Sequence, residues 1–258
     1  MCETTTSRKE LAFTPGVGPG SKGLAVKRLQ EWLNLRGNGI TIDGEFGPAT
    51  QAALKNFQAS QDIKPGNALT AQAWSALVQP MRNSLSATIA QQSNGSDACL
   101  QVAKIHLAQH PLEVGGDNCG PWVRLYTGGN EGADWRWCAG FVSFVMKQAC
   151  DLAGISAPLK GSLSCDTLAA RGQVAKRFVS GKDLVTDQIS TDALGSCAIF
   201  LVRRTPGDWT HAGFAFNFTS TTFQTIEGNT NDGGSTNGYE VCSRTRRLDG
   251  NKDFITLD

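Results

Sequence analysis

Four residues in the second half of the chain could do chemistry together. Cys138 stands in the run WRWCAGFVSFVMKQAC, His211 in THAGFAF, and Glu227 and Asn229 in TIEGNTN. A cysteine at the start of an amphipathic helix, followed on later strands by a histidine and a polar residue, can supply a thiol nucleophile, its base and an orienting group. This order predicts a thiolate that attacks a carbonyl carbon.

The helix expected around Cys138 runs from about Trp135 to Leu152 and has apolar residues along one side. It places Cys138 in the first turn, where unpaired amide N–H groups and the helix dipole stabilise a thiolate. Such settings, with a nearby imidazolium, lower the pKa of a cysteine to roughly 3.5 to 7.5. The same N–H groups could hold the oxyanion formed after attack. A cysteine in this position is more often a small buried apolar residue, as we expect for Cys150. The case for a reactive Cys138 therefore depends on the histidine and the polar residue that would lie beside it.

Three apolar runs predict strands around the histidine, over residues 195–204, 210–218 and 222–228. In a hairpin of the last two strands centred on Thr219, His211 lies directly opposite Glu227, within hydrogen-bonding reach on one face. We expect the cysteine helix to pack on that face. Asn229 has the same parity as Glu227 and is the second candidate for the orienting group. A slip of one residue would place His211 and Glu227 on opposite faces.

Two other patterns give weaker signals, both for a metal. His106 and His110 are spaced to share a helical face, but a third ligand and the glutamate of an H-E-x-x-H motif are missing. The run NTNDGGSTNG is rich in oxygen ligands but lacks the spacing of a calcium loop, and a Gly-rich strand connection is the better interpretation. We therefore expect no metal and no cofactor.

Composition and cysteine usage narrow the remaining possibilities. The 258 residues suffice for two small domains, and the net charge of +1 provides no basic field for nucleic acid. Arg244, Arg246 and Arg247 are interpreted as a solvated strand face. The eight cysteines include no C-x-x-C pair, and most are expected to be buried free thiols.

The N-terminal part predicts three short helices. One spans residues 23–36, the next carries Thr50, Ala53, Leu54 and Phe57 on its apolar side, and the third spans about 70–77. The strings GLAVKRLQEWL, DGEFGPATQAALKNFQ and AWSAL resemble the three-helix peptidoglycan-binding domain attached to many cell-wall hydrolases, over roughly residues 20–80. The resemblance implies that Asp43, Gly44 and Gly47 form the turn of that domain, and that Val26, Leu29, Phe46 and Phe57 form its core.

A polar segment separates this part from the rest. Residues 81–97 are rich in Ser, Asn and Gln, which favours an exposed connector. A helix is expected from Asp97 as N-cap to Pro111. The predicted organisation is an N-terminal extension over 1–19, a binding domain over 20–80, a linker over 81–97 and a catalytic domain over 98–258.

The second part also resembles a known family. The order EVGGDNCG, WCAGFVSFV, HAGFAF and TIEGNTN is similar to that of the CHAP family, cysteine- and histidine-dependent amidohydrolases/peptidases with a papain-like fold, over roughly residues 98–248. The resemblance implies Cys138 as nucleophile, His211 as base, and Glu227 with Asn229 as supporting polar groups. It departs where the family often has Gly-Asp and this chain has Gly195-Ser196. The expected fold class is α+β, a small three-helix bundle followed by helices packed on an antiparallel sheet.

Together the two resemblances imply a peptidoglycan hydrolase that cuts an amide bond through an acyl-enzyme. An N-acetylmuramoyl-L-alanine amidase and a stem or crosslink endopeptidase fit equally. No apolar N-terminal stretch or membrane-spanning run occurs, so we expect a monomer made in the cytoplasm without a signal peptide or membrane insertion. It would reach the wall after release, as an endolysin does, or as a secreted antibacterial effector. The rivals are a non-catalytic wall-binding protein and a thiol amidase acting on a non-wall substrate.

Overall fold

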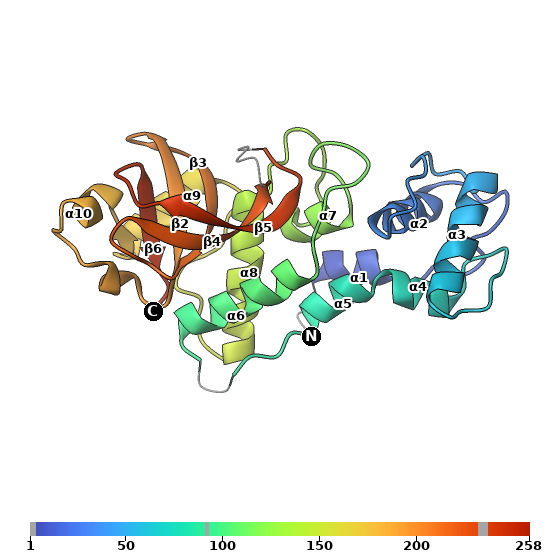
Figure 1. The fold of residues 1–258 in the computed structure, drawn as a ribbon, viewed down its shortest axis with the longest axis horizontal. Coiled ribbons are helices and arrows are strands. Elements are labelled where there is room, and N and C mark those ends of the chain that lie inside the picture. The colour runs from blue at the N-terminus through green and yellow to red at the C-terminus, as the bar shows by residue number, and fades with distance from the viewer. Residues whose placement is uncertain (1–3, 91–92, 232–236) are drawn as a thin grey trace.

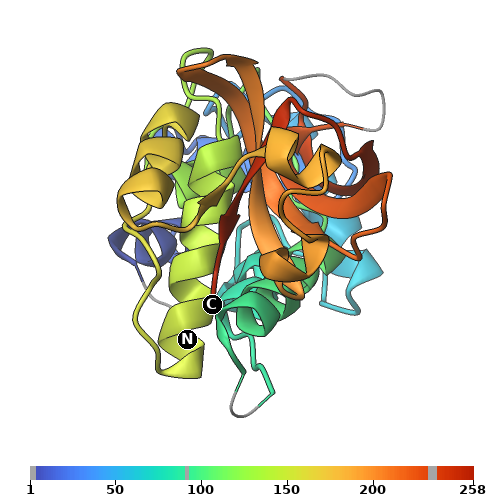
Figure 2. The same cartoon turned by 90° about the vertical axis from the view of Figure 1, so that its left-hand side faces the viewer.

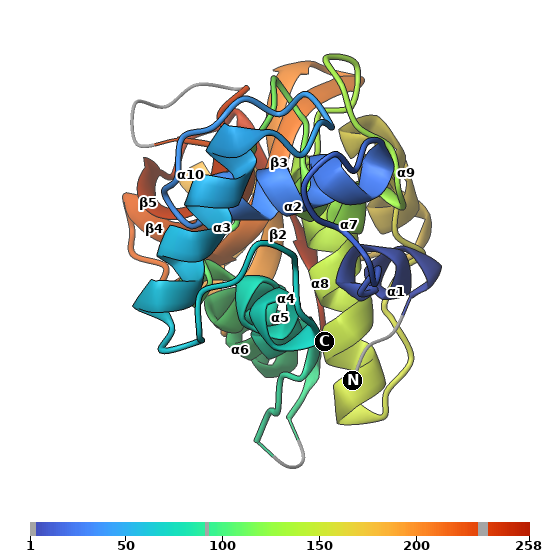
Figure 3. The ribbon, with the colours of Figure 1, turned by 90° about the vertical axis from the view of Figure 1, so that its right-hand side faces the viewer.

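The computed structural model describes residues 4–90, 93–231 and 237–258. Its N-terminal part is helical, with the elements α1 (Thr5–Leu11), α2 (Leu24–Leu35), α3 (Pro48–Ser60) and α4 (Ala71–Leu77). The last three correspond to the helices predicted from the sequence. The apolar side chains on their inner sides, among them Val26, Leu29 and Leu54, are fully buried. Figure 1 shows α2, α3 and α4 at one end of the molecule, and Figure 3 views them from that end.

The segment expected to be an exposed connector is partly folded. Helix α5 (Gln79–Leu85) follows α4 directly, and its residues Met81, Ser84 and Leu85 are buried. The side chain of Gln148 donates a hydrogen bond of 2.7 Å to the carbonyl oxygen of Ser84. Although this stretch is polar in composition, α5 therefore has a buried side that packs against the second half of the chain.

The second half consists of helices on an antiparallel sheet, which confirms the α+β class. The strands are β1 (Phe178–Val179), β2 (Cys197–Thr205), β3 (Asp208–Phe216), β4 (Thr222–Thr230), β5 (Glu240–Arg247) and β6 (Lys252–Thr256), in the order β1-β6-β2-β3-β4-β5. The three strands predicted around the histidine are β2, β3 and β4. The helices are α6 (Gly95–Ala108), α7 (Pro121–Thr127), α8 (Cys138–Ala153), α9 (Cys165–Val174) and α10 (Gly181–Val185), with a 3₁₀ turn, η1 (Thr191–Leu194). Helix α6 begins after Asn94, whose side chain caps it, so Asp97 is not the N-cap that the sequence predicts.

The two faces of the sheet carry separate cores. Helices α6, α8 and α9 cover one face, and α10 covers the other, as Figure 2 shows. On the α8 face Phe141 meets Phe214, with ring centroids 6.1 Å apart. On the other face Phe200, Phe223 and Phe254 form a smaller cluster. The prediction that α8 packs on the face of His211 is therefore wrong, because the larger apolar side chains Phe214, Phe216 and Ile226 alternate to the opposite side.

The register of the β3–β4 hairpin also differs from the prediction. Phe214 pairs with Ile226 and Ala215 with Thr225, which is a shift of two residues from the expected pairing. A shift of two keeps every side chain on its predicted face. His211 and Glu227 therefore remain neighbours, but on a diagonal, and Gly213 lies close to the side chain of Glu227.

A buried ion cluster joins the two halves. The guanidinium of Arg124, on α7, donates to both carboxylate oxygens of Glu10 on α1, at 3.0 and 2.8 Å, and of Glu31 on α2, at 3.1 and 2.7 Å. A further bond of 2.5 Å reaches Glu131. The side chains of Arg124, Glu10 and Glu31 are 8%, 2% and 1% exposed, so these charges depend on one another rather than on water. Within the described ranges, no helix is both long enough and apolar enough to cross a membrane.

Replacement of Arg124 by methionine is expected to lower the free energy of unfolding by about 3–5 kcal/mol, because Glu10 and Glu31 lose their main buried counter-charge. Urea denaturation measures the change. The control is Lys22→Met, which breaks the exposed pair with Glu45 and should leave stability almost unchanged. Equal small losses in both variants would contradict a structural role for the cluster.

Candidate active site

Cys138 is the first residue of α8, so it lies in the first turn as predicted, although the helix begins at Cys138 rather than at Trp135. The first helical hydrogen bond runs from the amide of Phe141 to the carbonyl of Trp137, at 2.8 Å, and no side chain caps this end of the helix. The amides of the first turn therefore lack intrahelical partners. Cys138 is 4% exposed, so its sulfur sits at the positive end of the helix in a largely dry environment.

The side chains of His211 on β3 and Glu227 on β4 are in contact on one face of the sheet. The Nε2 atom of His211 lies 2.8 Å from a carboxylate oxygen of Glu227, and the two side chains are 2% and 0% exposed. The Nδ1 atom of His211 is buried and makes no hydrogen bond to any oxygen or nitrogen of the described residues, so it is left for the thiol of Cys138. Of the two candidates for the orienting group, Glu227 is the one bonded to the histidine.

Glu227 is itself held on three sides. Arg246, on β5, donates from Nε and Nη2 to its two carboxylate oxygens, at 2.5 and 2.6 Å. The hydroxyl of Thr225 donates to it at 2.5 Å. The guanidinium of Arg246 also stacks over the ring of Phe200, 5.2 Å from its centroid. Arg246 is therefore part of the site, and the interpretation of this arginine as a solvated strand-face residue is wrong.

Gly213 makes the diagonal contact possible. A methyl group at this position would lie 2.6 Å from Phe200 and 2.9 Å from the Cγ atom of Glu227. A second glycine, Gly228, brings α8 close to β4, since a methyl group there would lie 2.8 Å from both Phe141 and Trp137. The two glycines thus allow the histidine, the carboxylate and the cysteine helix to approach from opposite faces of the sheet.

The charges of the site support a thiolate and imidazolium pair. The pKa of Cys138 lies well below the usual value, because the thiol of Cys165 hydrogen-bonds to it and the imidazole of His211 adds a positive charge, which together outweigh burial. Burial opposes the imidazolium of His211, yet Cys138 and Glu227 outweigh it and raise the pKa of His211 to about 9. Burial likewise opposes the carboxylate of Glu227, but Arg246 and His211 hold its pKa well below the usual value.

Asn229 lies in a neighbouring network rather than on the histidine. Its Nδ2 donates to the carbonyl of Gly238 at 2.8 Å and to Asn118 at 3.1 Å. Asn118 in turn donates its backbone N–H to Glu113 at 2.8 Å, and Glu113 accepts the indole N–H of Trp137, also at 2.8 Å. Asn229 therefore acts on the residue that immediately precedes Cys138.

The histidines proposed as a weak metal pair are separated by the end of α6. His106 is fully buried and bonds to Tyr126 and Gln148, both at 2.9 Å, and burial lowers its pKa to about 4. His110 lies beyond the helix with a φ of 48°, so the two do not share a helical face. Among the described residues, no group of three or more His, Cys, Asp or Glu side chains is placed to hold a metal. The calcium-like run includes residues 232–236, which lie outside the described part.

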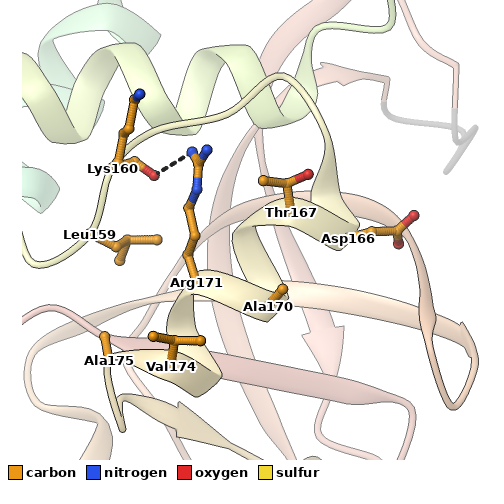
Figure 4. A pocket seen from close by; sticks show the side chains of 8 residues that line it. All are labelled: Leu159, Lys160, Asp166, Thr167, Ala170, Arg171, Val174 and Ala175. Atoms are coloured by element: carbon orange, nitrogen blue, oxygen red, sulfur yellow. Dashed lines mark hydrogen bonds between the residues drawn. The ribbon is translucent and has the colours of Figure 1, made fainter.

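A cavity of about 590 Å³ lies on the outer side of α9, and none of the four predicted site residues lines it. Figure 4 shows Leu159, Ala170 and Val174 along it, with Arg171 bonded to the carbonyl of Lys160 at 2.9 Å. Asp166 lies at one end and accepts the backbone N–H of Trp209 at 2.7 Å, which ties α9 to β3.

Two site residues were missed by sequence reasoning. Arg246 gave little signal, because it stands between Thr245 and Arg247, and only the pairing of its strand with the strand of Glu227 brings it to the site. Cys165 gave none, since only the fold brings the start of α9 to the start of α8. The structure also has buried free thiols, as the sequence predicts. They belong to Cys99, Cys138, Cys150, Cys165 and Cys197, and the free thiol of Cys119 is half-buried.

Comparison with known proteins assigns the N-terminal part. Residues 22–77 match a family model described as a putative peptidoglycan binding domain. No curated protein and no solved structure matches the chain. The match supports association with the cell wall and peptidoglycan as a partner.

The reactivity of Cys138 tests the charge state of the site. Alkylation by iodoacetamide should proceed at a pH well below the ordinary pKa of cysteine, with label on Cys138. In Glu227→Gln the midpoint of the pH profile should rise by about one unit or more, because the carboxylate no longer supports the imidazolium. Glu45→Gln makes the same chemical change on the surface and should leave the profile in place. An unchanged midpoint in Glu227→Gln would count against the ion pair.

Proposed function

We propose that the protein is a peptidoglycan hydrolase that cleaves an amide bond through an acyl-enzyme on Cys138. The observation that carries the proposal is the buried array of Cys138, His211 and Glu227 in one chain with a segment that matches a peptidoglycan-binding family. The resemblance of the second half to the CHAP family points to the same chemistry.

In the first step the thiolate of Cys138 attacks the carbonyl carbon of the substrate amide. The oxyanion that forms lies near the start of α8, where the unpaired amides of the first turn supply hydrogen-bond donors. The imidazolium of His211 then gives its proton to the leaving nitrogen, and the C–N bond breaks to leave a thioester. His211 next takes a proton from water, the hydroxide attacks the thioester, and Cys138 is released as the thiolate.

Glu227, Arg246 and Asn229 position the groups that react. Glu227 fixes the orientation of the imidazole and stabilises its charge, and Arg246 prevents the carboxylate from turning away. Asn229 acts at a distance, through Asn118 and Glu113, on the residue before the nucleophile. It is a positioning residue in this mechanism rather than a group that touches substrate.

The binding segment raises the local concentration of the catalytic half on an insoluble polymer. In this chain the tether is short and the cluster around Arg124 fixes α1 and α2 against α7, so the two parts approach the wall as a unit. The array does not discriminate between the bond that joins muramic acid to L-alanine and a peptide bond of the stem or crosslink. We favour an endolysin-like enzyme that is released to the wall, with a secreted effector as the alternative setting.

Digestion of purified sacculi tests the proposal. Wild-type protein should release soluble fragments, and Cys138→Ala should release none above background while it still sediments with the sacculi. Mass spectrometry of the fragments then identifies the bond. Free lactyl ends with intact stems mean an amidase, and broken stems or crosslinks mean an endopeptidase.

Cys119→Ala is the matched control, since it removes a half-buried thiol that lies outside the array, and it should digest sacculi like wild type. Wall binding without any product that depends on Cys138 would overturn the proposal in favour of a non-catalytic wall-binding protein. A thiol that is reactive in solution but inert on sacculi would instead point to a non-wall substrate.

A further inference from the structure

Cys138 has a sulfur neighbour that takes no covalent part in the hydrolytic mechanism. Cys165 is the first residue of α9, and its Sγ lies 3.8 Å from the Sγ of Cys138. The two residues are 8% and 4% exposed. They come from separate helices whose N-termini converge on one point.

The surroundings hold this contact in place. The side chain of Ser164 caps α9 by accepting the amide of Thr167 at 3.2 Å, and Asp166 ties the same turn to β3 through the amide of Trp209. Trp209 is two residues before His211, so one strand carries both the base and the anchor of Cys165. The backbone that carries Cys165 is therefore fixed against the strand of His211.

We propose that Cys138 and Cys165 form a reversible disulfide when the protein meets a peroxide, with Cys138 as the attacking thiolate and Cys165 as the resolving thiol. The proposal assigns a covalent modification site and a second role for the nucleophile. Formation of the bond does not depend on the proposed function, but its consequence, reversible loss of wall hydrolysis, rests on it.

The chemistry balances in two steps. The thiolate of Cys138 attacks one oxygen of hydrogen peroxide, the O–O bond breaks, and the hydroxide that leaves takes a proton to give water and a sulfenic acid. The sulfur of Cys165 then attacks the sulfenic sulfur, its proton leaves with the displaced hydroxide as a second water, and the S–S bond forms. The two thiols are oxidised by one peroxide, and an added dithiol reverses the change.

The geometry favours this path over deeper oxidation. A disulfide needs an S–S distance of about 2.05 Å, so from 3.8 Å the two sulfurs must approach by somewhat less than 2 Å. A sulfenic acid at Cys138 forms next to its resolving partner and is consumed before a second peroxide converts it to the irreversible sulfinic acid. The nucleophile is thereby protected while hydrolysis is suspended.

Peptide mapping reads the bond directly. Trypsin cleaves after Arg136, Lys147, Lys160 and Arg171, so Cys138 and Cys165 fall in the peptides 137–147 and 161–171, each with a single cysteine. After treatment of the full-length protein with hydrogen peroxide and blocking of free thiols, the two peptides should appear joined, with the loss of two hydrogen atoms. Sacculus digestion should fall at least tenfold in the same sample and return with dithiothreitol.

Cys165→Ser separates this proposal from simple oxidation of the nucleophile. In this variant peroxide should inactivate irreversibly, and peptide 137–147 should carry sulfinic acid. Cys119→Ser is the control and should behave like wild type. Absence of the joined peptide in wild type, or equal sulfinic acid in wild type and Cys165→Ser, would overturn the proposal. If sacculi are not digested before oxidation, the proposed function fails, while the joined peptide still reports on the disulfide.

Discussion

The interaction on which the site depends is the ion pair between Arg246 of β5 and the buried carboxylate of Glu227. Glu227 is fully buried, and it stays charged because Arg246 pairs with both of its oxygens while Thr225 and His211 complete its bonds. A buried carboxylate without such partners would take up a proton. It would then no longer favour an imidazolium at His211. The pKa of Cys138, which the hydrogen bond with Cys165 and the charge of His211 together lower, would lose the contribution of that charge. The charge state of Cys138 thus depends on an arginine two strands away from the histidine.

These contacts form at a place where the pairing of β3 with β4 is interrupted. Helix α8 packs on one face and the His211 side chain belongs to the other, yet the thiol and the imidazole interact. The pairing of β3 with β4 ends at Phe214 and Ile226. Just beyond that point the backbone N–H of Ala212 hydrogen-bonds to the sulfur of Cys138. Gly213 and Gly228 keep this region free of side chains that would hold the groups apart. Cys138, His211 and Glu227 therefore meet where the two strands cease to pair.

Much of this arrangement could be predicted from the sequence, and the failures have physical causes. The helix that carries Cys138 and the strands of His211 and Glu227 follow from local periodicity, although the helix begins three residues later than predicted. An error of two residues in the register leaves the faces of the strands unchanged, because side chains alternate with a period of two. The face on which α8 packs could not be read from small residues alone, since the large side chains Phe214 and Ile226 decided it. Cys165 and the cluster around Arg124 depend on contacts between distant segments, which local patterns do not encode. Arg246 was misjudged because a charged residue on an edge strand usually points into solvent. Here its pairing with the buried carboxylate of Glu227 holds it against the sheet.

The central claim is that Cys138 and His211 form a thiolate and imidazolium pair supported by Glu227. Its most direct test is nuclear magnetic resonance of protein labelled with nitrogen-15 in its three histidines. At pH 8 one imidazole should be doubly protonated in wild type, since the pKa of His211 is raised to about 9, and that signal should be missing in His211→Gln. It should become the signal of a neutral ring in Cys138→Ala, because the thiolate that stabilises the charge is gone. A neutral His211 in wild type at pH 8, or one whose charge does not depend on Cys138, would contradict the account.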